Sequence, residues 1–471
     1  MSAARVKFGT DGWRARIGEG FTGEAAGDVA LALAGALTGR PGRIALGYDG
    51  RTMSAEAAGV AAERLKRAGW RVAVAPGPVS TPMLSRAVAR HQFDGGLMIT
   101  ASHNPPEFNG IKLKTREGGS APEAVMRMAE GLLEGAPQAA GGGAVTGQDF
   151  RGEYVTELAG EARDLLYESE PAAIVIDYMH GAAGGVLAEA LGGTGATCVE
   201  IRAEPRPDFG GGLPEPIPAN LAGLRQAVAA RPGVSLGLAL DGDGDRIGVL
   251  LGDGSWFNSH QVLAVLIHHL AGRALTGKVL KTFSVARLVE RTARLHGLPV
   301  VETRIGFRYF VDEIVEGGVL IAGEESGGFY LADGQGQPVP ERDGARTALH
   351  LIAAAAAWPG GLAGVYGELA RQVGVAHHYD RVDLPVEDAA GVVQALASAI
   401  RDRAIGEIAG YAVTSVETLD GLKINLGPDR WVMLRGSGTE PVLRIYAEGE
   451  SPAVVEALLA EGAALTEKWS S

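Results

Sequence analysis

The stretch RIALGYDGRTMSAEAAGVAAERLKRAGWRVAVA, residues 43–75, has the pattern of a strand, a helix and a second strand. Residues 43–48 are a short apolar run, which favours a buried strand. Ser54 is a residue type that caps helix N-termini and Gly69 suits the position after a helix end, so a helix with Ser54 as its N-cap, running to about residue 68, is expected. Residues 71–75 are again apolar. A β-α-β unit of this kind predicts a mostly parallel sheet with helices on both faces.

The same alternation recurs along the next 250 residues. The expected elements are strands over 96–100, 174–177, 199–201, 236–240, 278–282 and 319–322 and a helix over 286–296. A Gly/Ala/Gln-rich stretch, residues 135–147, is interpreted as a linker after the first round. The sequence therefore predicts three consecutive α/β domains with mixed or parallel sheets.

The last hundred residues have a different pattern. Leu422, Ile424 and Leu426 alternate with polar residues, and the turn residues 427–429 separate them from a second alternating run. A terminal helix is expected over 453–468. Alternation of this kind is typical of an antiparallel sheet with one solvated face, so a smaller α+β domain is predicted. The expected domains are 1–148, 149–257, 258–372 and 373–471.

Composition excludes some classes of protein. The chain has 471 residues, a formal net charge of -13 and a single cysteine. The acidic balance argues against nucleic-acid binding, although a local group of arginines can still bind phosphate. One cysteine permits no internal disulfide, which indicates a reducing compartment. Residues 1–7 lack the apolar core of a signal peptide, and the most apolar run, 351–358, is far shorter than a membrane span. A cytoplasmic protein, outside the membrane, is expected.

The motif TASHNP, residues 100–105, follows an expected strand. Active sites of doubly wound sheets lie at the carboxyl ends of strands, so Ser102 stands where a nucleophile is expected. A serine hydroxyl needs a base or a metal to react, and His103 is adjacent, with Lys112 a few residues further on. The alternative is an ordinary surface turn rich in Ser and Asn, and this motif alone does not decide between the two.

The motif DGDGDR, residues 241–246, also follows an expected strand. Its three carboxylates, two residues apart, suit Mg²⁺ or Ca²⁺. A calcium EF-hand loop is excluded, because its sixth position requires Gly and is Arg246, and its twelfth requires Glu and is Gly252. A solvated acidic turn remains the alternative. The adjacent arginine favours a phosphate beside the metal.

Two further glycine-bounded loops carry polar side chains. GEESGG, residues 323–328, could hydrogen-bond vicinal sugar hydroxyls, or be a plain polar turn. RGSGTEP, residues 435–441, combines Arg, Ser and Thr with exposed backbone N–H groups, which is typical of an anion nest. No Walker-type Gly-Lys-Thr sequence occurs, so a nucleotide-binding P-loop is not indicated.

Together and in this order, the four motifs resemble those of the α-D-phosphohexomutase superfamily, nearest to its phosphoglucomutase/phosphomannomutase enzymes. FGTDGWR at 8–14 looks like the family's opening loop, and RIGFR at 304–308 and PERDG at 340–344 resemble further family segments. The resemblance spans nearly the whole chain. It implies a heart-shaped enzyme with one motif loop per domain around a central cleft. The implied activity is an isomerase reaction, the transfer of phosphate between the 1- and 6-positions of a hexose.

The resemblance also implies roles for individual residues. Ser102 would carry the phosphoryl group, and Mg²⁺ would be held by a phosphoserine oxygen and Asp241, Asp243 and Asp245. The implied catalytic residues are Ser102, His103, Lys112, Arg14 and Arg246. The implied substrate-binding residues are Lys281, Gly306, Glu324, Ser326, Arg435, Ser437, Gly438 and Thr439. A hexose 1,6-bisphosphate would be both intermediate and activator, sugar phosphates the only expected partners, and the protein a monomer or dimer.

Three positions depart from common family patterns. Gly328 stands where many dual-specificity members have His, and Arg308 where phosphoglucomutases often have Lys. Arg308 is a poor general acid or base, because arginine is effectively always protonated. Gly436 stands where Pro is common, which should loosen the phosphate loop.

Glucose is the expected sugar, since the opening loop, the sugar loop and PERDG resemble the phosphoglucomutase branch. Phosphomannomutase activity could accompany it. Phosphoglucosamine mutase is a weaker alternative, because that branch usually has Gln in the sugar loop and Ile in place of Trp13. Two alternatives belong to other functional classes. A Mg²⁺-dependent phosphatase with a serine nucleophile would be recognised by its release of free phosphate. A non-catalytic sugar-phosphate sensor is disfavoured, because it would not need Ser102 and all three aspartates.

Overall fold

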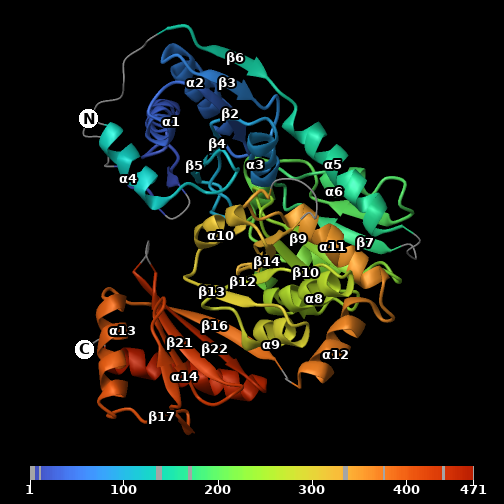
Figure 1. The fold of residues 1–471 in the computed structure, drawn as a ribbon, viewed down its shortest axis with the longest axis vertical. Coiled ribbons are helices and arrows are strands. Elements are labelled where there is room, and N and C mark those ends of the chain that lie inside the picture. Colours follow the sequence, from blue (N-terminus) through green and yellow to red (C-terminus); the bar gives the residue numbers. More distant parts are fainter. Residues whose placement is uncertain are drawn as a thin grey trace. The chain divides into compact units, whose positions relative to one another are not determined.

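The computed structural model describes residues 6–9, 12–133, 141–167, 172–332, 338–374, 377–437 and 441–469. The chain divides into two compact units, drawn in Figure 1. The first unit comprises Met1–Lys278 and Gly306–Val365, and the second comprises Val279–Ile305 and Tyr366–Ser471.

The first sheet of the first unit has six strands in the order β1-β5-β4-β2-β3-β6. They are β1 (Trp13–Arg16), β2 (Arg43–Tyr48), β3 (Arg71–Val74), β4 (Gly95–Ile99), β5 (Phe108–Lys114) and β6 (Ala144–Gly147). The pairs β2–β3, β2–β4 and β3–β6 are parallel, whereas β5 runs antiparallel to β4 and β1. The sheet is therefore mixed, with the predicted strands within one residue of their expected bounds.

Helices cover both faces of this sheet. The helices are α1 (Gly23–Thr38), α2 (Ser54–Arg67), α3 (Thr81–Arg90) and α4 (Glu123–Leu132). α1, α2 and α4 share one apolar core with Leu46 and Leu97. Gly47 and Gly96 alternate with those leucines, so they face the other side. A Cβ on either glycine would lie 3.5 or 3.6 Å from the Leu84 side chain, which places α3 on that second face.

The second sheet has five strands in the order β11-β10-β9-β7-β8. They are β7 (Ala173–Asp177), β8 (Thr197–Ile201), β9 (Leu236–Leu240), β10 (Ile247–Leu251) and β11 (Trp256–Phe257). The pairs β7–β8 and β7–β9 are parallel, and β10 pairs antiparallel with β9 and β11. The other elements of this region are α5 (Phe150–Leu165), α6 (Val186–Ala190), η1 (Phe209–Gly211), η2 (Pro218–Asn220) and α7 (Ala222–Ala229). Every residue of the apolar β9 is buried, and this strand leads directly into the aspartate motif.

The third α/β region contributes to both units. In the first unit, β14 (Val319–Gly323) pairs antiparallel with β15 (Phe329–Leu331). In the second, β12 (Lys278–Thr282) pairs in parallel with β13 (Val300–Thr303) from Val279 onward. The helices are α8 (Ser259–Gly272), α9 (Arg287–Leu295), η3 (Phe307–Phe310), α10 (Val311–Glu316), α11 (Gly344–Ala356) and α12 (Gly361–Val373).

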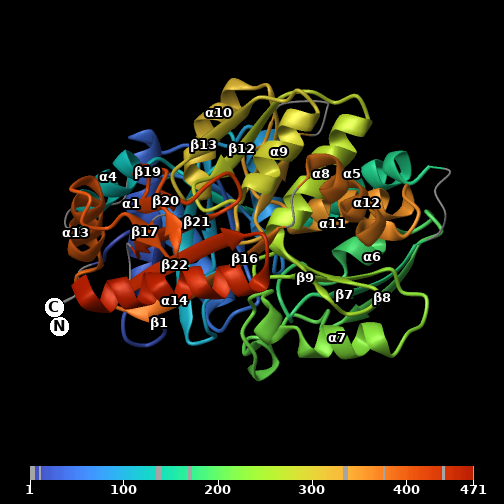
Figure 2. The ribbon, with the colours of Figure 1, turned by 90° about the horizontal axis from the view of Figure 1, so that it is seen from below.

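The C-terminal region is the predicted α+β domain. Its antiparallel sheet has the order β16-β22-β21-β20-β19. The strands are β16 (His378–Pro385), β19 (Ser415–Glu417), β20 (Leu422–Asn425), β21 (Trp431–Gly436) and β22 (Val442–Gly449), beside a small pair, β17 (Glu407–Ile408) and β18 (Tyr411–Ala412). α13 (Ala389–Arg401) packs on β21, and α14 (Pro452–Trp469) lies along β22 and β16, as Figure 2 shows. The predicted fold class, three α/β domains and a smaller α+β domain, is confirmed.

Two local predictions are wrong. The expected linker 135–147 ends in β6, which extends the parallel part of the first sheet by pairing with β3; its residues 135–140 lie outside the described ranges. Ser54 is the first residue of α2 rather than its cap, and the cap position belongs to Met53. The Ser54 hydroxyl instead donates to Asp49 Oδ1 at 2.7 Å, because a buried carboxylate needs that donor.

Among the described helices, none is by itself long and apolar enough to cross a membrane. Taken together, α11 and α12 meet the length and composition test, but they are bent by 78° at the break between them.

Candidate active site

Ser102 follows the carboxyl end of β4, as predicted. Its side chain is buried and its backbone has φ +55°, a left-handed conformation that few residues other than glycine adopt. The Ser102 N–H donates to Thr100 Oγ1 at 2.8 Å, and the Thr100 hydroxyl donates to Asp49 Oδ2 at 2.6 Å. Hydrogen bonds to the neighbouring strand end therefore hold the serine in a strained conformation.

Arg51 supports the same loop from the carboxyl end of β2. Its guanidinium is fully buried, and its Nε lies 3.2 Å from Asp49 Oδ2. Its other nitrogens donate to four backbone carbonyls of the serine loop, those of Ser102, Asn104, Pro105 and Phe108. The ring of Phe209 lies 4.6 Å from Cζ, so an aromatic face covers the cation. One arginine thus satisfies four carbonyl groups of the loop.

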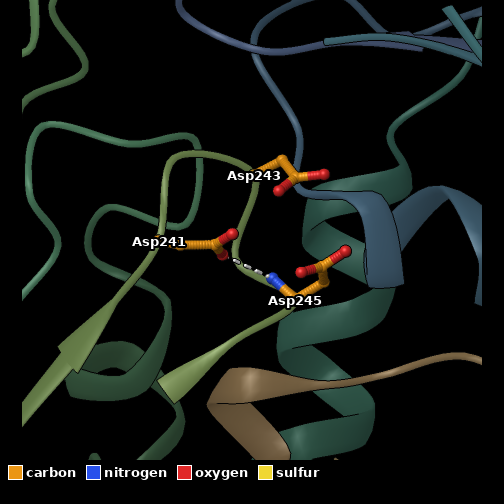
Figure 3. Close-up of side chains that lie close together, drawn as sticks. All are labelled: Asp241, Asp243 and Asp245. Carbon is orange, nitrogen blue, oxygen red and sulfur yellow. Dashed lines mark hydrogen bonds between the residues drawn. The ribbon is translucent and has the colours of Figure 1, made fainter. Parts of the chain in front are cut away.

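The loop between β9 and β10 brings Asp241, Asp243 and Asp245 together (Figure 3). All three are fully buried, and a ligand oxygen from each lies within 4.8 Å of the others. The Asp245 N–H donates to Asp241 Oδ1 at 2.9 Å, which curls the loop around that carboxylate. Gly244 has φ +73°, and this turn requires a residue without a Cβ penalty.

The triad and the serine loop are in direct contact. Ser102 Oγ lies 3.2 Å from Asp241 Oδ2. A Cβ on Gly242 would lie 2.6 Å from the Ser102 carbonyl oxygen, so only glycine allows this approach. Thr81, at the start of α3, donates to Asp243 Oδ2 at 2.5 Å. The predicted nucleophile and the predicted metal ligands therefore form one site.

The donor set of the triad fits a hard divalent cation. Three carboxylates and a hydroxyl converge, and oxygen ligands are those that Mg²⁺ prefers. Within the described residues, Asp243 Oδ1 and Asp245 Oδ1 are buried and have no hydrogen-bond partner. Buried polar atoms without a partner are rare, and a bound ion is one explanation for them. The side chains of this loop can thus hold the cation that the motif suggested.

Lys112 and Arg342 donate to carboxylates of the triad at close range. Lys112 on β5 lies with its Nζ 2.8 Å from Asp243 Oδ2 and 2.9 Å from Asp245 Oδ2. Arg342, which precedes α11, donates from NH2 to Asp245 Oδ2 at 2.6 Å. Each contact neutralises charge that three neighbouring carboxylates would otherwise concentrate in a buried loop.

The three carboxyl groups differ in their affinity for protons. Burial, and then the charges of Asp245 and Asp243, raise the pKa of Asp241 well above its usual value. Burial alone would also raise the pKa of Asp243 and Asp245, but the neighbouring cations outweigh it. Lys112 lowers the pKa of Asp243, and Arg342 followed by Lys112 lowers that of Asp245.

His103 lies beside the serine hydroxyl, with its Nδ1 3.4 Å from Ser102 Oγ. Burial lowers its pKa well below 6.5, and the charges of Arg246 and Arg14 lower it further. The ring is therefore neutral near pH 7 and able to accept a proton. Arg14 reaches the same loop from β1 and donates to Asn104 Oδ1 at 2.6 Å. Arg246 lies with its Nε 3.8 Å from Asp245 Oδ1.

The sugar-loop candidates of the first unit adjoin this cluster. Glu324 follows β14 and is 5% exposed, and its Oε2 lies 3.3 Å from Arg342 NH1. Burial raises its pKa, which Arg342 partly offsets. Ser326 is half-buried in the turn between β14 and β15. Gly306 has φ +130° and leads into η3.

The second unit contains the other candidates. Lys281 on β12 is 1% exposed and forms ion pairs with Glu302 and, at 2.8 Å, with Glu290. Burial acts to lower the pKa of Lys281, but the charges of Glu290 and Glu302 outweigh it and raise the pKa overall. The lysine lines a cavity of about 560 Å³ with both glutamates. Its charge is already matched by the unit's own side chains.

The phosphate-loop candidates lie at the end of β21. Arg435 and Ser437 line a cavity of about 490 Å³ next to the N-terminus of α13. Arg435 Nε lies 3.1 Å from Asp420 Oδ2. Gly438 and Thr439, also predicted to bind substrate, lie outside the described residues.

Sequence reasoning missed three side chains that the structure brings to the site: Arg51, Thr81 and Arg342. Arg51 had a usable signal, because DGR at 49–51 follows a buried strand that neighbours β4. Arg342 lies within the PERDG segment, which resembles the family without indicating a role for each residue. Thr81 had no signal beyond its position at a helix start.

Comparison with known proteins agrees with this architecture. Four family models match successive parts of the chain: Phosphoglucomutase/phosphomannomutase alpha/beta/alpha domain I at residues 5–139, domain II at 153–254, domain III at 258–372 and the C-terminal domain at 382–465. The fold and these matches define an enzyme of the phosphohexomutase class, an isomerase that moves a phosphoryl group within a sugar. The chain belongs to the phosphoglucomutase/phosphomannomutase family.

Individual relatives are similar over almost their full length. A "Phosphoglucosamine mutase" of Salinispora arenicola is 33% identical over 94% of each chain, and a "Probable phosphoglucosamine mutase" of Methanothermobacter thermautotrophicus is 30% identical, also over 94% of each. A crystal structure of a "putative phosphomannomutase" from Thermus thermophilus superposes with a TM-score of 0.86 at 35% identity. It covers 99% of this chain and 100% of its own. These names differ in the sugar but agree in the class of reaction.

Proposed function

We propose that this protein interconverts hexose 1-phosphates and hexose 6-phosphates through a phosphorylated Ser102, with a hexose 1,6-bisphosphate as intermediate and activator. The observation that carries the proposal is the contact between Ser102 Oγ and the aspartate triad, 3.2 Å from Asp241. A phosphate on this serine would stand among carboxylates that bind Mg²⁺ and near the cations Lys112 and Arg246. Phosphoryl transfer depends mainly on such positioning and charge neutralisation.

Asp241, Asp243 and Asp245 would hold the cation together with an oxygen on Ser102. Bound Mg²⁺ supplies charge stabilisation to the transferring phosphoryl group. Arg51 keeps the serine loop fixed, since its guanidinium binds the carbonyl of Ser102 itself. His103 is the proposed proton acceptor for the attacking sugar hydroxyl, because its ring is neutral and adjacent to Ser102 Oγ. Arg14 and Lys112 orient and neutralise the groups around the transferred phosphate.

The sugar must present first one end and then the other to the same serine. Glu324 and Ser326 are proposed to bind sugar hydroxyls, with Gly306 and Lys281 as further substrate contacts. Arg435, Ser437, Gly438 and Thr439 are proposed to bind the phosphate that is not reacting. One phosphate site and one set of hydroxyl contacts can serve both orientations, because the bisphosphate has a phosphate at each end.

Glucose is proposed as the preferred sugar, with mannose as a second substrate. The charge around Glu324 supports a neutral hexose: its carboxylate already has Arg342 as a cationic partner at 3.3 Å. The ammonium group of glucosamine would meet that guanidinium at close range, and like charges repel. Glucosamine remains an alternative substrate, because two relatives at 30% and 33% identity carry the name phosphoglucosamine mutase.

The test measures product formation by ³¹P NMR from glucose 1-phosphate, mannose 1-phosphate and glucosamine 1-phosphate. Each reaction contains Mg²⁺ and a catalytic amount of glucose 1,6-bisphosphate. Conversion to the 6-phosphate is expected, fastest for glucose. Ser102→Ala should lower the rate by about 10³-fold or more, because it removes the oxygen that carries the phosphoryl group.

Ser235→Ala is the matched control, because that hydroxyl donates to the Ala173 carbonyl in the second sheet and should leave the rate unchanged. Steady release of free phosphate would identify a phosphatase instead. If none of the three sugars isomerises, the proposed reaction is wrong.

A further inference from the structure

Arg342 joins the metal triad to the sugar loop. Its side chain is 8% exposed, and one guanidinium reaches two carboxylates that come from different sheets. NH2 lies 2.6 Å from Asp245 Oδ2 and NH1 lies 3.3 Å from Glu324 Oε2. Because both contacts use the same rigid, planar group, the positions of the two carboxylates are linked.

The path of the Arg342 side chain depends on Gly328. A Cβ at position 328 would lie 2.2 Å from Arg342 Cδ and 3.0 Å from its Cγ. The arginine stem therefore fills the space that any side chain at 328 would need. The ring of Phe307 lies 5.5 Å from Arg342 Cζ, which adds an aromatic contact to the cation. The Arg342 side chain can therefore take this path only because position 328 in the sugar loop is glycine.

The two contacts have opposite consequences for ligands. At Glu324, the guanidinium fixes Oε2 and compensates a buried charge, so the carboxylate is held ready to accept hydrogen bonds from hydroxyl groups. At Asp245, the guanidinium binds an oxygen of the triad and thereby competes with an incoming divalent cation. Removing the arginine should therefore weaken sugar binding at Glu324 and strengthen cation binding at Asp245.

We propose that Arg342 is a positioning residue that holds Glu324 for sugar binding and competes with the divalent cation at Asp245. Its loss consequently changes the affinities for sugar phosphate and for Mg²⁺ in opposite directions. The sugar half of this proposal rests on the proposed function, whereas the metal half rests only on the geometry of the triad.

The experiment uses the full-length, dephosphorylated protein, which cannot turn over sugar phosphate without a bisphosphate. Isothermal titration measures Mg²⁺ binding and, separately, glucose 1-phosphate binding. Arg342→Met keeps the unbranched stem and removes the charge. We expect Mg²⁺ to bind about fivefold more tightly, because a competing cation has left the triad. Glucose 1-phosphate should bind about tenfold more weakly, because Glu324 has lost its partner.

Two further variants test the route of the effect. Glu324→Gln should weaken glucose 1-phosphate binding, and adding Arg342→Met should weaken it little more, because the arginine acts through that carboxylate. Gly328→Ala leaves every charge in place but displaces the Arg342 stem. It should also weaken glucose 1-phosphate and tighten Mg²⁺, by smaller factors than Arg342→Met.

Arg346→Met is the control for burial. Arg346 is equally buried and on the adjoining helix turn, but its guanidinium binds Glu161 and backbone carbonyls rather than the site. Arg346→Met should change thermal stability but leave the affinities for Mg²⁺ and glucose 1-phosphate at the wild-type values. If Arg342→Met fails to fold, Gly328→Ala tests the same two affinities.

Unchanged or weaker Mg²⁺ binding in both Arg342→Met and Gly328→Ala would overturn the proposal. So would unchanged glucose 1-phosphate binding in variants of a protein whose wild type isomerises this sugar. Absence of hexose-phosphate turnover in the wild type would instead reject the proposed function, and the Mg²⁺ titrations would still decide the metal half.

Discussion

Two buried clusters of charge, one in each unit, solve the problem of burying like charges in different ways. In the first unit, three aspartates of one loop lie within 4.8 Å of one another. In the second unit, Lys281 and Lys423 lie close enough that the charge of one lowers the pKa of the other. The lysines belong to buried strands, whereas the aspartates belong to the loop that follows one.

The lysine cluster is compensated by its own unit. Glu302 contacts both lysines, and Lys423 Nζ lies 4.3 Å from the Phe283 ring centroid and 4.8 Å from that of Trp431. In the aspartate cluster, by contrast, two buried carboxylate oxygens have no hydrogen-bond partner within the described ranges, despite Lys112 and Arg342. The difference indicates that the charge of the lysine cluster is balanced within its own unit, whereas the aspartates form a site whose charge is completed by a ligand.

Asp243→Asn should give the largest effect and separates the two clusters most clearly. The substitution keeps the size of the side chain but removes one charged ligand, so Mg²⁺ affinity and mutase activity should each fall by about 10²–10³-fold. The measurements are Mg²⁺ titration calorimetry and product formation from glucose 1-phosphate. Mg²⁺ should also raise the thermal transition of the wild type, because a ligand that binds only the folded state stabilises it.

That thermal shift should vanish in Asp243→Asn. Should the variant keep the wild-type Mg²⁺ affinity, the triad would not be the metal site, and the contrast between the two clusters would disappear.

Glu302→Gln tests the compensated cluster. It leaves two buried lysines with one carboxylate fewer, so the free energy of unfolding should fall by about 3 kcal/mol, as for other broken buried pairs. The measurement is urea unfolding followed by tryptophan fluorescence. Mg²⁺ affinity should stay at the wild-type value, because the ion pairs of Glu302 are with Lys281 and Lys423 rather than with the triad.

Glu313→Gln is the matched control. Its partner Lys278 is 35% exposed, and such pairs contribute at most about 1 kcal/mol. A loss in Glu302→Gln no larger than that of the control would mean that the lysine cluster does not depend on its glutamates.

The sequence allowed most of the architecture to be predicted, because the buried strands are short apolar runs with clear breaks. The strands at 43–48, 236–240 and 278–282 have the expected bounds. The edge strand β6 was missed because its four residues are all exposed and carry no apolar periodicity. Ser54 was misassigned because its hydroxyl binds Asp49, a competing acceptor that capping preferences do not consider.

The site was predictable where function resides in contiguous motifs. Ser102 and the three aspartates belong to loops that directly follow buried strands, and the carboxyl ends of strands are where the active sites of α/β sheets lie. Arg51 and Arg342 were not assigned roles, because the serine-loop carbonyls that Arg51 binds lie 51–57 residues away in the sequence and the carboxylates that Arg342 binds lie 18–97 residues away. Spacing within a motif contains no information about contacts of that kind. The ion pairs of Lys281 with its glutamate partners could not be predicted for the same reason.

Lys423 provides the smallest and most specific test of the comparison. Burial, and then the charge of Lys281, lower its pKa from 10.5 to about 8. Below pH 8 the lysine is charged in both the folded and the unfolded protein, and the buried charge costs stability. Between pH 8 and 10.5 the folded protein releases this proton while the unfolded chain keeps it. The unfolded state then binds more protons, so stability should rise with pH across this window.

Lys423→Met removes this titration. From about pH 7.5 to about pH 9.5, wild type should gain about 2 kcal/mol in the free energy of unfolding relative to the variant. Urea unfolding at the two pH values measures the difference, and Lys468→Met, at an exposed position of α14, should follow the wild type. Equal pH dependence in wild type and Lys423→Met would show that the rings and glutamates hold the lysine fully charged. The second cluster would then compensate its buried cations completely, and its contrast with the aspartates, whose charge needs a ligand, would become sharper.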